Sequence, residues 1–167
     1  MKRFSCKKLA FLGSAILLAS CVSYPDSRPP EERKAQLDSA ARDVLGSYEV
    51  VDSRKDDFRG TTQVAIDETA GGLSVTLRKQ NGKALKIEGT KCSGHYSAKN
   101  GFTSATCDVK DGSGVYYFTI SQKKSGDIVK DGALLLPFEP MPVPGDGYLL
   151  DVGRHGGRSN YYVLKKQ

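Results

Sequence analysis

Closely spaced glycine turns constrain the fold of this 167-residue chain more than any other feature. Dipeptides of the Asn-Gly and Asp-Gly type supply the positive φ angles that tight hairpins require. They stand at 81–82, 100–101, 111–112, 131–132 and 146–147. Too few residues separate the turns for the crossover helices of parallel sheets. We therefore expect the chain from residue 47 onward to form short antiparallel strands.

The segments between these turns show the period of two that is typical of strands. Leu73-Ser-Val-Thr-Leu77 and Val115-Tyr-Tyr-Phe-Thr-Ile120 alternate so that each strand presents one apolar face. This spacing predicts a mainly β domain, an antiparallel meander that closes into a small barrel or packs as a sandwich. The expected strands are Tyr48–Ser53, Thr62–Asp67, Leu73–Lys79, Ala84–Gly89, Gly94–Ser97, Phe102–Val109, Val115–Gln122, Ala133–Phe138, Tyr148–Val152 and Asn160–Lys165.

One amphipathic helix is expected ahead of the strands, over residues 31–46. Pro30 suits the first helical turn, and Gly46 suits the end of the helix. The apolar residues fall at i, i+3, i+4, i+7 and i+8, a single stripe made of Leu37, Ala40, Ala41, Val44 and Leu45. This stripe either packs on the β domain or binds a partner.

The first twenty residues have the layout of a secretory signal. Lys2, Arg3, Lys7 and Lys8 precede an apolar run from Leu9 to Leu18, which is too short to span a bilayer. The following Leu18-Ala19-Ser20-Cys21 resembles the lipobox of bacterial lipoproteins at all four positions.

That resemblance implies that residues 1–20 are removed and that Cys21 carries a thioether-linked diacylglycerol and an N-acyl chain. Two or more acyl chains anchor a protein stably in a membrane. Val22 in place of an Asp favours the outer membrane in this class, with the domain facing the periplasm. Residues 21–30 then form the lipidated cysteine and a proline-rich tether, residues 31–46 the helix, and residues 47–167 the periplasmic β domain.

Removal of the signal also changes the charge and the count of cysteines. The mature chain keeps 21 basic against 19 acidic residues, because residues 1–20 hold four basic and no acidic ones. The high isoelectric point therefore gives no support for nucleic-acid binding. Cys92 and Cys107 remain as a pair in an oxidising compartment, which predicts a disulfide between antiparallel strands on either side of residues 99–101.

The sequence contains no set of residues that we interpret as catalytic. Asp151, His155 and Ser159 share one glycine-rich loop, which supplies neither a nucleophile elbow nor an oxyanion hole. No cluster has the spacing of a metal site, and no cofactor motif is present. Arg154, His155 and Arg158 in this loop are read as solvated turn residues or as a site for an anion or an acidic partner.

The stretch Leu134–Gly145 combines apolar side chains with four prolines. Proline excludes helix and central strand. We therefore expect either an extended arm that seals one end of a barrel or an exposed polyproline ligand for a partner.

These features predict a lipid-anchored, non-enzymatic binding protein of the outer membrane, whose partner is an envelope protein or a cell-wall component. A second interpretation comes from Ser113, Gly114 and Tyr117, whose spacing is similar to the Ser-Gly-x-x-Tyr of the membrane-bound lysozyme-inhibitor family. That resemblance implies inhibition of lysozyme. A third interpretation is a lipocalin-like barrel that encloses a small ligand.

Overall fold

The structure is a computed structural model that describes residues 29–97, 102–110, 112–124, 126–129, 141–143, 145, 147–156 and 158–167. Cys21, most of the expected tether, the turn at 100–101 and the expected strand Ala133–Phe138 lie outside the described residues.

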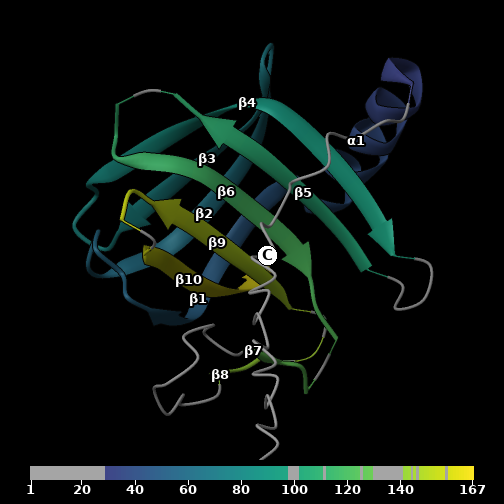
Figure 1. The fold of residues 1–167 in the computed structure, drawn as a ribbon. Coiled ribbons are helices and arrows are strands. Elements are labelled where there is room, and N and C mark those ends of the chain that lie inside the picture. Colours follow the sequence, from purple (N-terminus) through teal and green to yellow (C-terminus); the bar gives the residue numbers. More distant parts are fainter. Residues whose placement is uncertain are drawn as a thin grey trace, which may run out of the picture.

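Eight antiparallel strands form a closed barrel in the order β1-β10-β9-β6-β5-β4-β3-β2 (Figure 1). Closure depends on the pairing of the first strand with the last, in which Tyr48 lies opposite Lys166. The predicted mainly β fold class is thus confirmed, and of the two expected architectures the structure is a barrel. The strands are β1 (Gly46–Arg54), β2 (Thr61–Thr69), β3 (Gly72–Lys79), β4 (Ala84–Ser97), β5 (Phe102–Val109), β6 (Val115–Gln122), β9 (Tyr148–Arg154) and β10 (Arg158–Lys166).

Helix α1 (Pro30–Val44) precedes the barrel and ends two residues before the boundary expected from the sequence. Leu45 already has an extended backbone, and its N–H donates to the carbonyl of Ala41 at 2.8 Å. Gly46 belongs to β1, where its φ of 135° suits glycine. The apolar stripe packs on the domain, because Ala40, Ala41 and Val44 are buried in the barrel core.

The strands expected at 84–89 and 94–97 form a single strand, β4, and this corrects the prediction of two. A bulge interrupts its pairing with β5 between Thr90 and Ser93, and Lys91 has a φ of 49° there. A bulge adds a residue and bends the strand without ending it. The irregular run Thr-Lys-Cys-Ser-Gly therefore marks a bend within one strand.

A short two-stranded sheet lies outside the barrel, formed by β7 (Ile128–Val129) and β8 (Met141–Pro142) (Figure 1). Met141 and Val143 are buried in a second apolar cluster with Leu149 and Val163. The residues that follow Leu149 and Val163 in the chain, Leu150 and Leu164, belong to the barrel core. The described part of the proline-rich stretch thus covers the outer face of β9 and β10, while residues 134–140, on which the choice between a seal and an exposed ligand depends, lie outside the described residues.

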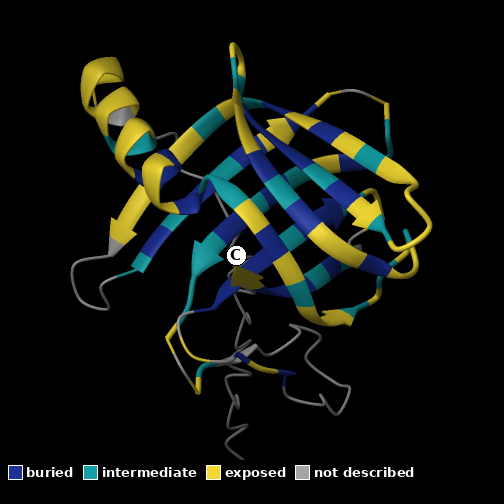
Figure 2. Ribbon diagram, turned by 180° about the vertical axis from the view of Figure 1, so that it is seen from behind, coloured by how far each residue is buried: buried dark blue, intermediate teal, exposed yellow. Residues whose placement is uncertain are grey.

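Alternating burial along the strands places one row of side chains inside the barrel (Figure 2). The largest fully buried side chains include Tyr48, Phe118 and Tyr162. The last turn of α1 closes one end of the barrel. Tyr48 Oη donates to the carbonyl of Val44 at 2.5 Å, and Tyr148 Oη donates to the carbonyl of Asp43 at 3.2 Å.

The predicted disulfide is present between Cys92 in β4 and Cys107 in β5. These strands are adjacent and antiparallel, as expected, and Cys92 lies within the bulge. Gly72 leaves room for the bridge, because a Cβ there would lie 2.3 Å from Cys92 Sγ. Leu73 N–H also donates to that sulfur at 3.3 Å.

Candidate functional site

The end of the barrel opposite α1 brings together three turns that are far apart in the sequence. We call this end the rim and define it by Asp57, Ser113, Gly114, Arg154 and His155. The backbone N–H of His155 donates to the carbonyl of Gly114 at 3.1 Å. Arg154 Nη1 donates to Asp57 Oδ2 at 3.0 Å. A hollow of about 590 Å³ is lined by Asp57, Gly114, Arg154 and His155 of the rim, together with Gly156.

The rim joins two motifs that the sequence analysis treated separately. The turn with Ser113 and Gly114 pairs with the hairpin that carries Arg154 and His155, since Val115 lies opposite Arg154 in the sheet. The ion pair of Arg154 with Asp57 is partly exposed, with side-chain accessibilities of 35% and 41%. Water screens such a pair, so it contributes less than about 1 kcal/mol to stability. Its role at this end is to position two charges.

The residues of the Ser-Gly-x-x-Tyr pattern point to different surfaces. Ser113 lies at the rim, where its Oγ accepts a hydrogen bond from Val115 N–H at 3.3 Å. Tyr117 turns to the outer face of the sheet and donates to Asp151 Oδ2 at 3.0 Å. The phenol has one proton, so Ser159, whose Oγ lies 3.2 Å from the same oxygen, donates to it.

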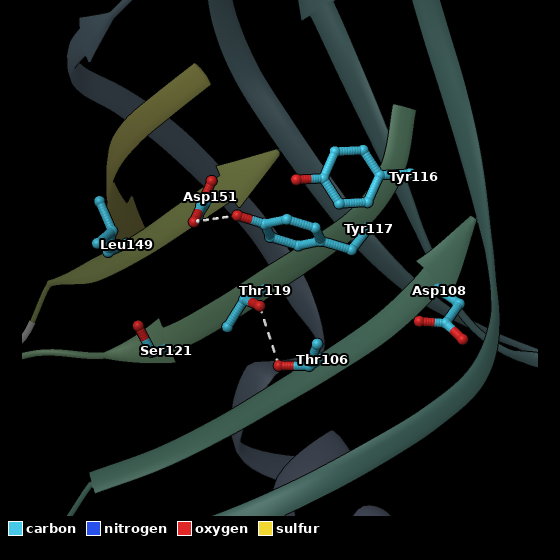
Figure 3. A pocket seen from close by; sticks show the side chains of 8 residues that line it. All are labelled: Thr106, Asp108, Tyr116, Tyr117, Thr119, Ser121, Leu149 and Asp151. Carbon is cyan, nitrogen blue, oxygen red and sulfur yellow. Dashed lines mark hydrogen bonds between the residues drawn. The ribbon is translucent and has the colours of Figure 1, made fainter. Parts of the chain in front are cut away.

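A second hollow, which we call the outer hollow, lies on the outer face of β5, β6 and β9 and has a volume of about 620 Å³ (Figure 3). Hydroxyl groups, two carboxylates and two tyrosines dominate its wall. Thr106 and Thr119 are linked to each other through their hydroxyls at 2.9 Å. The lining residues are Thr106, Asp108, Tyr116, Tyr117, Thr119, Ser121, Leu149 and Asp151.

Tyr116 connects the outer hollow to the rim. Its ring lies 4.9 Å from the ring of Tyr117, edge to face, and 5.6 Å from the ring of His155. Tyr116 is 40% exposed and, with Val51 and Tyr96, is one of three large hydrophobic residues exposed among the described residues. Tyr116 therefore lies between the outer hollow, which it lines, and the rim, where its ring contacts that of His155.

The phenol of Tyr117 stays protonated over a wider pH range than a free tyrosine. Burial raises its pKa, and the nearby carboxylate of Asp151 adds to the increase, while the hydrogen bond from Ser159 opposes it. At neutral pH the outer hollow thus presents a neutral phenol that donates to a carboxylate.

The three residues of the apparent hydrolase pattern are divided between these surfaces. Asp151 and Ser159 both contact the hydroxyl of Tyr117, whereas His155 lies on the exposed turn beside Tyr116. Arg158 begins β10 directly opposite Arg154. Within the described ranges, no group of three or more His, Cys, Asp or Glu residues could hold a metal ion. No helix in the part of the chain that the structure describes has the length and hydropathy needed to cross a bilayer.

Sequence reasoning missed most of the outer hollow. Thr106, Asp108, Thr119 and Asp151 occupy the polar positions of alternating strands, and this pattern occurs on any solvated sheet face. Their common location depends on the pairing of β6 with β9, which are consecutive strands of the barrel but are separated in the chain by β7 and β8, outside the barrel. Tyr116, which is exposed, and Tyr117, which is half-buried, are adjacent in the sequence, and this aromatic pair is the local signal that could have indicated the surface.

Comparisons of this chain with protein-family models, with curated proteins and with solved structures find no match.

Proposed function

We propose that this protein is a lipid-anchored, non-enzymatic lipoprotein of the bacterial outer membrane that faces the periplasm and binds the glycan of the cell wall. The observation that carries the proposal is the composition of the outer hollow, which combines two tyrosines, two carboxylates and several hydroxyls on one continuous face (Figure 3).

These side chains have the chemistry that recognises sugars. A glycan has hydroxyls around the edge of each ring and apolar C–H groups on its faces. Asp108 offers carboxylate oxygens that accept hydrogen bonds from hydroxyls, and Asp151 Oδ2 holds the hydroxyl of Tyr117 in the same wall. Tyr116 offers an exposed ring on which a sugar face can stack, together with a polar tip.

The expected address of the chain supports the same ligand. The lipobox-like Leu18–Cys21 and the proline-rich residues that follow imply a domain held close to the membrane on the periplasmic side. The cell wall is the extended glycan polymer of that compartment. The mature chain has nearly balanced charge, which suits a ligand recognised through hydroxyls and ring faces.

Co-sedimentation with purified peptidoglycan sacculi tests the proposal. We expect the full chain to sediment with sacculi and Tyr116→Ala to bind about fivefold more weakly, because the stacking of one aromatic ring contributes about 1 kcal/mol. Tyr96→Ala is the matched control, since Tyr96 is 62% exposed on β4 and is not among the residues that line the outer hollow. Absence of sedimentation, or an equal loss in both variants, would contradict the proposal.

A second candidate function, inhibition of lysozyme, is favoured by the place of the Ser113-Gly114 turn. This turn lies at the rim beside the guanidinium of Arg154, where Gly114 has a φ of 78° and a Cβ would approach Arg154 Nη2 to 3.3 Å. An excess of the purified protein over lysozyme gives the test. If the parent protein lowers the lytic activity of lysozyme and the Ser113→Ala variant lowers it less, this function is favoured. Unchanged lysis in the presence of the parent protein would exclude it.

A further inference from the structure

We propose that the mouth of the barrel is a second binding site, which takes a small apolar molecule carrying one hydrogen-bond donor that reaches the side chain of Asn160. We call the space the mouth cavity. It is distinct from the outer hollow, because its walls are the inward-facing side chains at the rim end of the barrel, and it has a volume of about 270 Å³.

The wall of the mouth cavity is mainly apolar. Leu77, Ile87 and Val152 form its inner part and belong to the barrel core. Phe58, in the turn between β1 and β2, also lines the mouth cavity and packs against that core. Lys79 Nζ lies 4.4 Å from the centre of the Phe58 ring, which holds the ring at the edge of the opening.

Asn160 is a buried polar residue in this mainly apolar wall. The residue is 4% exposed and lines the mouth cavity. Its Oδ1 has no hydrogen-bond partner among the described residues. Burial of an amide oxygen without a partner is unfavourable, and such groups in folded proteins are usually satisfied by protein, water or ligand. Asn160 also lies opposite Val152 in the sheet, so its neighbour across the strands supplies no donor side chain.

The charged groups of the rim lie at the entrance. Arg154 and Asp57 both line the mouth cavity, and their ion pair of 3.0 Å closes part of the opening. Because the two charges compensate each other, the entrance does not select an ion. An uncharged ligand fits this arrangement better than a fatty acid or a phosphate ester.

The volume sets the size of the ligand. An apolar protein cavity of about 150 Å³ holds benzene. The mouth cavity, at about 270 Å³, has room for a molecule with two fused rings or a short branched chain. The ligand class is thus a compact neutral molecule with an apolar body and one hydroxyl or amide N–H.

A matched pair of probes tests the hydrogen bond. Naphthol and the corresponding methylnaphthalene have nearly the same shape, and only naphthol has a donor. We expect naphthol to bind the full chain about fivefold more tightly, which corresponds to one neutral hydrogen bond. The Cys21→Ala full chain is used for both probes, because a protein without lipid needs no detergent that would absorb them.

Asn160→Leu removes the amide that would accept a hydrogen bond from the ligand, while it keeps the size of the side chain. The variant should therefore no longer prefer a ligand with a donor group. We expect the two probes to bind this variant equally, with naphthol weakened about fivefold. The nitrogen-15 resonance of the Asn160 side chain should shift with naphthol in the unaltered site. Leu85→Phe, which narrows the entrance from a partly buried position, gives a second variant that should weaken both probes.

Each outcome decides the proposal. If both probes bind with equal affinity and neither variant changes that affinity, they bind elsewhere and the proposal is overturned. Absence of binding at millimolar concentrations of the probes would overturn the proposal as well. Sacculus binding by Asn160→Leu should equal that of the parent chain, because Asn160 faces the inside of the barrel. Sacculus binding therefore tests the glycan proposal, probe binding tests the mouth cavity, and either proposal can fail without the other.

Discussion

At the scale of single residues, close packing against glycine positions the elements around the barrel. Gly94 in β4 lies directly under α1, and a Cβ there would lie 2.3 Å from the carbonyl oxygen of Gln36 and 2.6 Å from the Cα of Leu37. Both are backbone atoms, which cannot move without shifting the helix. Gly153 in β9 serves the outer hollow in the same way, because a Cβ there would lie 2.0 Å from the ring of Tyr117.

Gly94→Ala is expected to destabilise the domain by about 2 kcal/mol, because overpacking of this kind displaces the backbone of α1. The free energy of unfolding in urea measures the effect. Gly71→Ala is the control, since a Cβ there would meet only the carbonyl oxygen of Gly89, at 3.5 Å, an ordinary contact. Equal stabilities of the two variants would show that α1 does not pack closely on β4.

At the scale of elements, the bulge in β4 and the disulfide act together. The bulge places Cys92 opposite Cys107 and toward Leu73 and Gly72 of β3. The bridge therefore joins β4 to β5 where regular pairing is interrupted. Cross-linking at an interruption of the ladder restrains two strands that would otherwise separate more readily there.

Replacement of both cysteines, Cys92→Ser with Cys107→Ser, is expected to lower the free energy of unfolding by about 3 kcal/mol, the value for a closed loop of about 15 residues. Chemical denaturation under oxidising conditions measures it. Addition of a reductant to the parent chain should give the same stability as the double variant. A parent chain that keeps its full stability when reduced would contradict the expectation.

At the scale of the whole molecule, the two ends of the barrel differ. The last turn of α1 closes one end through Tyr48 and Tyr148, and the turns with Asp57, Gly114 and Arg154 surround the other (Figure 1). Since the chain enters the domain through α1, the proposed lipid anchor is connected to the closed end. The rim and the mouth cavity then lie at the end that is not connected to the membrane anchor.

Cys21→Ala should abolish membrane attachment and release a soluble periplasmic form, because the acyl chains are proposed to be the anchor. Metabolic labelling with an alkyne fatty acid, followed by fractionation of the envelope, measures both consequences. Cys6→Ala is the matched control, since Cys6 lies within the segment expected to be removed. Labelling that persists in Cys21→Ala would contradict the lipoprotein assignment.

The sequence by itself determined the local features of this protein. Turn dipeptides, alternation and the apolar stripe of α1 each depend on neighbouring residues, so the β class, the helix and most strand limits could be predicted. The cysteine pair was predictable as well, because its two strands are consecutive. The exceptions are the bulge, where alternation fails at Thr90–Ser93, and the segment 141–143, whose apolar residues pack outside the barrel.

The tertiary structure alone decided the closure of the barrel and the position of the two proposed binding sites. Pairing of β1 with β10 joins the first and the last strand of the chain, and pairing of β6 with β9 passes over β7 and β8, so no local pattern specifies these partners. Closure is favourable because it leaves no unpaired strand edge. The pairing of β6 with β9 brings Gly114 to His155 and Tyr117 to Asp151, and the closed barrel places the buried amide of Asn160 in the wall of the mouth cavity.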